Sequence, residues 1–89
     1  MTTQLDSARA TYAAALSAAE ILENEAVPLS IENETAASAS YRAGKIDLGA
    51  LLVIRREVLD TRREHLDRLL DAAVAGVDLW IARGAPSIP

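Results

Sequence analysis

Apolar residues recur every seven positions along two long segments of this sequence. In the second segment the series is Leu52, Leu59, Leu66, Ala73 and Trp80. In the first segment the series is Ala8, Ala15, Leu22, Leu29 and Ala36. A seven-residue apolar repeat directs one face of an α-helix toward a partner helix, as in a coiled coil. We therefore predict an all-α fold with two long helical arms, residues 1–42 and 47–83.

Residues 43–46 form the predicted turn between the arms. Gly44 has no Cβ and readily adopts the left-handed backbone conformation that ends a helix. The carboxylate of Asp47 can accept hydrogen bonds from the free N–H groups at the start of the next helix. Beyond the second arm, Gly84, Pro86 and Pro89 predict a loose C-terminal tail over residues 84–89.

Folding the chain back about Gly44 matches large side chains with small ones. Trp80 then lies opposite Ala8, and Tyr12 lies opposite Gly76. Such matching is what a closely packed antiparallel coiled-coil hairpin requires. The predicted hairpin core consists of Ala8, Tyr12, Leu22, Leu29, Leu52, Leu59, Leu66, Leu69 and Trp80.

Pro28 lies inside the first arm and conflicts with a regular helix. It lacks the N–H that an internal helical hydrogen bond needs. Two outcomes are open: a kink in a continuous arm, or a break that gives three helices. The seven-residue phase continues from Leu22 through Leu29 to Ala36, which favours the kink near Pro28.

The composition predicts that this chain does not bury its apolar surface alone. Hydrophobic residues make up 51% of the chain, yet aromatics make up 3% and Phe is absent. Two apolar groups exceed what one seam between two helices covers. One follows the turn and comprises Leu48, Leu51, Leu52, Val53 and Ile54; the other comprises Leu70, Val74, Val77 and Ile81. We therefore expect further helices, or other copies of this chain, to complete a helical bundle.

Charge and cysteine content exclude several classes of function. The formal net charge is −4, which argues against a nucleic-acid partner. The absence of cysteine excludes disulfides, thiolate nucleophiles and cysteine zinc sites. The polar first residues predict no signal peptide, and no apolar run is long enough for a transmembrane helix.

We predict no catalytic residues, metal site or cofactor. An acidic stripe follows the second arm: Glu57, Asp60, Glu64, Asp67 and Asp71. A carboxylate-bridged metal enzyme is one interpretation of it, but interleaved arginines favour a solvated ion-pair face with pairs such as Glu64–Arg68 and Arg56–Asp60. His65 is the only histidine. It lacks the Glu-x-x-His spacing of a di-iron bundle, so we expect an ordinary residue beside the seam.

The turn and its flanks resemble a known family. Residues 41–52 read Tyr-Arg-Ala-Gly-Lys-Ile-Asp-Leu-Gly-Ala-Leu-Leu. This run resembles the Tyr-x-x-Gly-x-(Ile/Thr)-(Asp/Ser)-(x)n-Leu-Leu signature of TolC-like outer-membrane efflux proteins. Residues 55–66 and 72–79, and then Ala82-Arg83-Gly84, are similar to the returning helix of that family and its closing Ala-x-Gly. Val27-Pro28 resembles the Leu-Pro of the heavy-metal, CzcC-like branch. The resemblance covers most of residues 20–84 and is strongest over 38–84.

The resemblance implies a location and partners. Such proteins are trimers in which an outer-membrane β-barrel continues into a periplasmic helical tunnel. They are the exit ducts of tripartite pumps that export metal ions or small molecules. The Tyr-x-x-Gly turn meets a periplasmic adaptor protein. On this chain the implied docking tip comprises Tyr41, Arg42, Ala43, Gly44, Lys45, Ile46, Asp47 and Leu48.

The chain departs from this family in length, because family members have several hundred residues, two repeats and barrel strands. We therefore expect a C-terminal fragment or truncated form of such a protein, which by itself forms a dimer or larger bundle. The alternative is a free-standing helical interaction protein that self-associates through its apolar faces.

Overall fold

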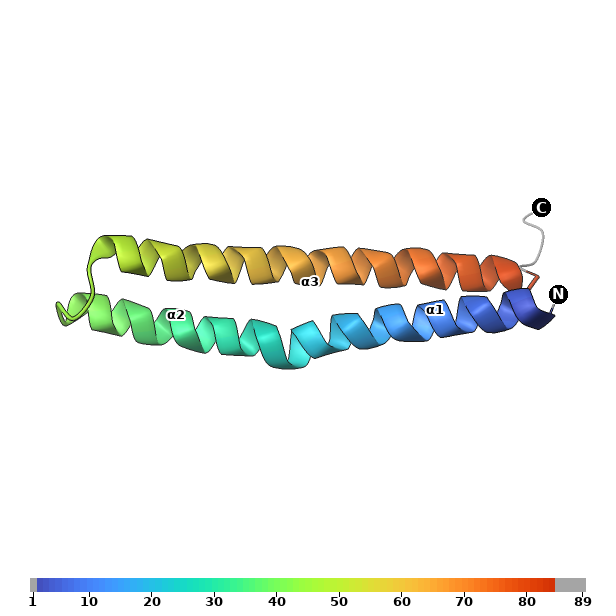
Figure 1. Ribbon diagram of the computed structural model, residues 1–89, viewed down its shortest axis with the longest axis horizontal. Coiled ribbons are helices and arrows are strands. Elements are labelled where there is room, and N and C mark those ends of the chain that lie inside the picture. Colours follow the sequence, from blue (N-terminus) through green and yellow to red (C-terminus); the bar gives the residue numbers. More distant parts are fainter. Residues whose placement is uncertain (1, 85–89) are drawn as a thin grey trace.

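The computed structural model describes residues 2–84, which form one helical hairpin (Figure 1). The elements in chain order are α1 (Thr2–Ile21), the π-helical segment η1 (Leu22–Ala26), α2 (Val27–Arg42) and α3 (Leu48–Ala82). The hairpin is a rod of 62 × 25 × 15 Å. Its first arm, from α1 to α2, runs antiparallel along α3 (Figure 1). The predicted all-α antiparallel hairpin is thus confirmed. Of the predicted tail, all residues after Gly84 lie outside the described part of the chain.

Backbone hydrogen bonds close the turn at the end of α2. Gly44 has a φ of 75°, which a residue without Cβ adopts at little cost. The N–H of Lys45 donates to the carbonyl of Ser40 at 2.8 Å, and the N–H of Gly44 donates to the carbonyl of Tyr41 at 3.0 Å. These two bonds form a Schellman motif, which satisfies the last carbonyls of a helix as the chain leaves it.

Asp47 starts α3 as an N-cap, as the sequence predicts. Its backbone is extended, with φ −86° and ψ 172°. Its Oδ1 accepts a hydrogen bond from the N–H of Ala50 at 2.8 Å. The first free N–H groups of a helix are the groups that such a cap satisfies. The two helix ends at the turn are therefore both fixed by local bonds.

The seam between the arms is made of small and medium-sized side chains. We call its α3 side the α3 seam. Over most of the helix, successive residues of the α3 seam are separated alternately by three and by four positions. It consists of Leu51, Ile54, Val58, Thr61, His65, Ala72, Ala75, Leu79 and Ala82, all buried or half-buried. On the first arm the most buried side chains are Ala19 and Ala37. Alanines at the contact let two helix axes approach closely.

The α3 part of the predicted core is wrong by one residue. Leu52, Leu59, Leu66, Leu69 and Trp80 are all exposed, whereas Leu51 is only 3% exposed. The reason is that α3 carries two seven-residue series next to each other. The spacing alone does not reveal which series faces the partner helix, because both repeat every two turns.

The alignment of the two arms along the rod axis matches the prediction at Tyr12, which was expected opposite Gly76. A Cβ added to Gly76 would lie 3.2 Å from Cε1 of Tyr12, so the Tyr12 ring packs on Gly76. Ala8 and Leu22, two other predicted core residues, are half-buried. Trp80 does not join them, since 47% of it is exposed. The predicted place of Trp80 in the hairpin core is therefore wrong.

The first arm bends where η1 meets α2, in the cyan part of Figure 1. The predicted kink is confirmed, and the arm does not break into separated helices. The predicted phase is nevertheless wrong beyond this point. Leu29 is 56% exposed, Ala36 is exposed, and their neighbours Ser30 and Ala37 are turned inward. The physical reason is the wider turn of η1, which adds one residue to the first arm.

Candidate functional site

The turn residues form the end of the rod that lies opposite the start of α1 (Figure 1). The predicted docking tip, Tyr41 to Leu48, is therefore one continuous accessible surface. Ile46 is half-buried, and the other residues of the tip are exposed. The Schellman motif and the Asp47 cap hold its backbone, so a partner would meet a preformed loop.

The tip offers positive charge and apolar side chains. Within residues 2–84, neither Arg42 nor Lys45 forms an ion pair. Tyr41 and Leu48 are exposed beside them. The Asp47 carboxylate is engaged by the N–H of Ala50. A partner that suits this surface has apolar side chains and acidic groups at its edge.

A second surface extends along α3 and consists of the seven-residue series that the sequence pattern turned toward the first arm. We call it the outer stripe: Leu52, Leu59, Leu66, Ala73 and Trp80, all exposed. Each member follows a position of the α3 seam by one residue, which is a rotation of about 100° around the helix axis. The stripe thus lies about 130° from the centre of the seam, on the side of α3 that turns away from the first arm.

The neighbours of the outer stripe differ between its two halves. Toward the tip, Leu59 stands three or four residues from four arginines on the helix surface: Arg55, Arg56, Arg62 and Arg63. Toward the other end the neighbours of Ala73 are apolar or small: Leu69, Leu70, Gly76 and Val77; Arg83 stands three residues after Trp80. The stripe is therefore an apolar track with a basic border in its tip-proximal half.

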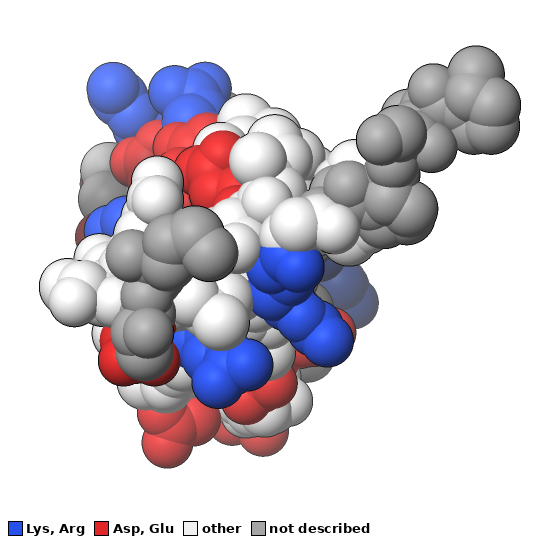
Figure 2. Space-filling model, turned by 90° about the vertical axis from the view of Figure 1, so that its right-hand side faces the viewer, with Lys and Arg blue, Asp and Glu red and all other residues white. Residues whose placement is uncertain are grey.

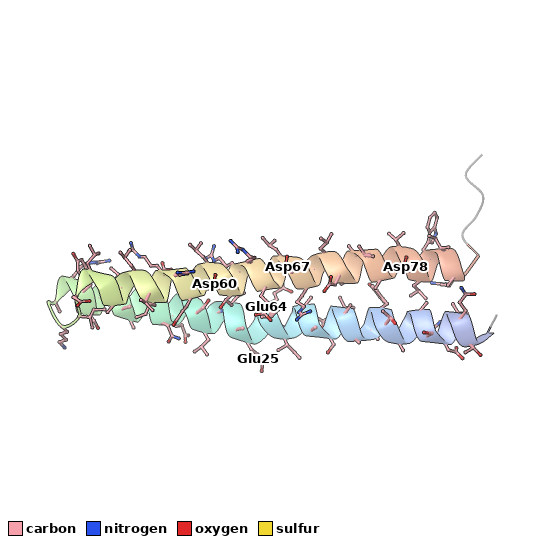
Figure 3. All side chains as sticks on the ribbon, turned by 45° about the horizontal axis from the view of Figure 1, so that its top comes forward. Glu25, Asp60, Glu64, Asp67 and Asp78 are labelled. Atoms are coloured by element: carbon pink, nitrogen blue, oxygen red, sulfur yellow. The ribbon has the colours of Figure 1, made fainter. Side chains whose placement is uncertain are left out.

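The acids of α3 are distributed along the helix. Among residues 2–84 no group of three or more His, Asp or Glu side chains is placed so that it could hold a metal ion. Figure 3 shows the labelled acids spread along the rod instead of converging on one point. Arg68 lies 3.9 Å from Glu64 and 3.5 Å from Asp71, so the predicted Glu64–Arg68 pair is present. Seen along the rod, acidic and basic side chains alternate around its circumference (Figure 2).

His65 lies in the α3 seam and not beside it. It occupies the position between Val58 and Ala72 in the seven-residue series. Its Nε2 is buried and has no hydrogen-bond partner. No group of three or more potential metal ligands within residues 2–84 includes it.

Three open grooves of the described surface lie between the arms, and a further one lies on the first arm alone. The groove nearest the start of α1 is lined by Thr3, Gln4, Ser7, Ala8, Thr11, Ala75, Asp78, Ile81 and Ala82. It holds one carboxylate and no nucleophile–base pair, which a reactive site would need.

Sequence reasoning missed the outer stripe as a surface, because it assigned these residues to the hairpin core. The available signal was the neighbouring series that begins at Leu51, one residue earlier in each repeat. None of the helices described, from Thr2 to Ala82, combines the length and apolar content that crossing a bilayer demands.

Comparisons of the chain with models of protein families, with curated proteins and with solved structures found no match.

Proposed function

We propose that this chain is a wall hairpin from the periplasmic tunnel of a TolC-like outer-membrane efflux protein of the heavy-metal branch. Its work is structural: the two arms contribute to the wall of a duct for metal ions or small molecules, and the tip docks a periplasmic adaptor. The observation that carries the proposal is the outer stripe on the side of α3 that turns away from the seam. The motif at residues 41–52, which spans the turn and the first residues of α3, supports it.

The angle between seam and stripe favours a wall over a compact bundle. In a compact four-helix bundle each helix buries one continuous face toward a shared core. In a wall each helix has neighbours on two nearly opposite sides. The outer stripe lies about 130° from the centre of the α3 seam, which suits the second arrangement. Leu59 and Leu66 are 66% and 65% exposed, so a neighbour would cover substantial apolar area.

Charge complementarity supports another copy of the same hairpin as that neighbour. The first arm carries five acids between residues 20 and 34 and no Lys or Arg there: Glu20, Glu23, Glu25, Glu32 and Glu34. Glu34 shares a groove with Arg55 and Arg62. The acidic section of the first arm and the basic border of the stripe therefore lie at the same position along the rod axis. The two ion pairs within residues 2–84 are both internal to α3. A parallel neighbouring copy would therefore bring its exposed acids, Glu20, Glu23, Glu25 and Glu32, beside these arginines.

Self-association tests the wall role directly. Sedimentation of the intact chain over a range of concentrations should show a concentration-dependent oligomer. Leu59→Glu with Leu66→Glu should abolish it, because the change buries charge in the stripe. Val53→Glu is the control, since Val53 is also more than half exposed on α3, at 58%, but lies outside the stripe. A wild-type chain that stays monomeric at all concentrations would contradict the proposal.

Docking by the tip needs a separate test. A photo-crosslinking amino acid in place of Lys45, in cells of the source organism, should crosslink to a periplasmic adaptor identified by mass spectrometry. The same amino acid in place of Glu20, an exposed residue of α1, should not. Crosslinks to cytoplasmic proteins only would favour the alternative, a free-standing helical protein that self-associates through the same stripe.

The genomic sequence upstream of the Met1 codon separates these two functions further. The tunnel proposal expects it to continue in frame with strands of barrel type and a signal sequence. An in-frame stop codon together with a separate ribosome-binding site would favour the free-standing protein.

A further inference from the structure

The face of the first arm that packs on α3 shifts by one residue at η1. Up to Ala26, the last residue of η1, the inward side chains follow two seven-residue series: Leu5, Tyr12, Ala19 and Ala26, and Ala8, Ala15 and Leu22. After η1 the inward side chains are Val27, Ser30, Glu34 and Ala37, and nearer the turn Ser38 and Ser40 are half-buried as well. Continued without a shift, the first series would have placed Asn33 inward, and the second would have placed Leu29 and Ala36 inward. All three are exposed.

The geometry of η1 accounts for this shift. The N–H of Val27 donates to the carbonyl of Leu22, five residues earlier, where an α-helix would use a residue four earlier. A π turn of this kind inserts one residue into the helix and moves every later side chain around the axis. The inward face therefore shifts directly after η1, between Ala26 and Ser30.

Pro28 provides a cause for the π turn. It follows η1 directly after Val27. In a regular α-helix its ring would clash with the carbonyl of Asn24, and its missing N–H would leave that carbonyl unpaired. Ser30 adds a local bond, since its Oγ donates to the carbonyl of Val27 at 2.8 Å. The backbone around Pro28 thus favours the bulged form.

The burial of apolar side chains favours a regular α-helix over the bulged form. In the bulged form Ser30 and Glu34 are half-buried while Leu29 is exposed. A regular helix would turn Leu29, Asn33 and Ala36 toward α3 instead, and so exchange a serine for a leucine in the seam. The sequence therefore encodes two registers of α2, one preferred by Pro28 and the other by the hydrophobic pattern.

We propose that Pro28 and η1 form a register switch, which decides which face of α2 packs on α3. Going from one register to the other rotates α2 by about 100° relative to α3. Because α2 leads into the tip, the switch also sets how the docking tip is presented. In the bulged register Leu29 is available to a neighbouring helix, and in the regular register it is withdrawn into the seam.

Cysteine accessibility tests this switch, because the chain contains no cysteine. Ala36→Cys and Ala37→Cys are made separately, and alkylation by iodoacetamide is timed on the folded chain. Position 36 is expected to react about tenfold faster than position 37, because the thiol at position 37 becomes accessible only through local opening. In the Pro28→Ala background the order is expected to reverse.

A compensating variant controls for unrelated effects of losing the proline. Deleting Asn24 in the Pro28→Ala background removes the inserted residue together with the π turn. The original order should return, with position 37 protected again. The switch is overturned if position 37 stays protected in Pro28→Ala, or if the deletion fails to restore its protection. Loss of the helical circular-dichroism signal in Pro28→Ala would equally overturn it, because both registers are folded states.

Discussion

Gly44 sets the direction of the second arm through its backbone alone. Its φ of 75° is a conformation that a residue with a Cβ adopts at a cost of about 1–2 kcal/mol. No atom lies within 4 Å of a Cβ placed there, so the cost of a substitution would come from strain and not from a clash. The turn is thus a place where one residue type is required for local reasons.

Gly44→Ala is expected to destabilise the hairpin by about 1–2 kcal/mol, which corresponds to a drop in Tm of roughly 5–15 °C for a chain of this size. Gly49→Ala is the matched control. Gly49 is helical, and its added Cβ would meet Oδ1 of Asp47 at 3.5 Å, an ordinary contact. This control should raise stability by up to about 1 kcal/mol through helix propensity. Thermal unfolding followed by circular dichroism compares the two, and equal Tm values for both variants would contradict the strain argument.

Asp47 contributes through its side chain. Asp47→Ala removes the acceptor for the N–H of Ala50 and should cost about 1 kcal/mol in the free energy of unfolding. Asp47→Ser keeps an oxygen in reach of the same N–H and should recover most of that loss. Chemical denaturation measures both variants. An equal loss for alanine and serine would show that the charge of Asp47, and not its capping bond, matters at this helix end.

At the scale of helices, α3 has two apolar faces with different tasks. In the seam, small and medium-sized side chains pack the two arms together. In the outer stripe, leucines and Trp80 are exposed to solvent. Leu51 and Leu52 are chain neighbours that fall on different faces. Their exposed fractions are 3% and 52%. Substitutions at Leu51 and Leu52 therefore distinguish the contribution of the seam from that of the outer stripe.

Leu51→Ala should destabilise the hairpin by about 2–4 kcal/mol, because it removes a buried side chain and leaves a cavity. Leu52→Ala should cost less than about 1 kcal/mol, because the side chain already contacts water. Urea unfolding at low protein concentration compares the two variants without contributions from self-association. If Leu52→Ala lowers the free energy of unfolding more than Leu51→Ala does, the seam contains the series of Leu52 and not that of Leu51.

At the scale of the whole molecule, the hairpin is a thin rod. Its shortest dimension is 15 Å, little more than the diameter of one helix. A rod of this shape buries few residues: six apolar side chains are buried among the described residues, and four of them are alanines. Large side chains such as Leu59 and Leu66 remain outside. The rod therefore exposes apolar surface along its length that assembly with further helices would cover.

Salt should weaken that assembly if arginines and glutamates of neighbouring copies face each other. Raising the salt concentration from about 0.1 M to about 1 M shortens the Debye length from about 10 Å to about 3 Å. We expect the oligomer of the intact chain to dissociate at a higher protein concentration in high salt than in low salt, as measured by sedimentation. Arg55→Gln with Arg62→Gln should remove most of this salt dependence. An assembly that tightens in high salt would instead be held by apolar contact alone.

Local sequence signals determined the hairpin and its ends. The seven-residue repeats require long helices, Gly44 supplies the left-handed residue and Asp47 supplies the cap, and each of these acts within a few residues of chain. The predicted tip residues follow from the same turn. The packing of Tyr12 on Gly76 also followed from sequence, because folding about a tight turn leaves little freedom in axial alignment.

Tertiary structure decided the rotation of each helix about its own axis. Two adjacent apolar series on α3 fit the same repeat, and only contact with the alanine-rich first arm selected the series of Leu51 over that of Leu52. Beyond Pro28, the π turn of η1 moved Leu29 outward and Ala37 inward. The physical reason is common to both: the spacing of a repeat fixes the period of a helix, but the rotation that minimises the free energy depends on the partner surface and on backbone strain.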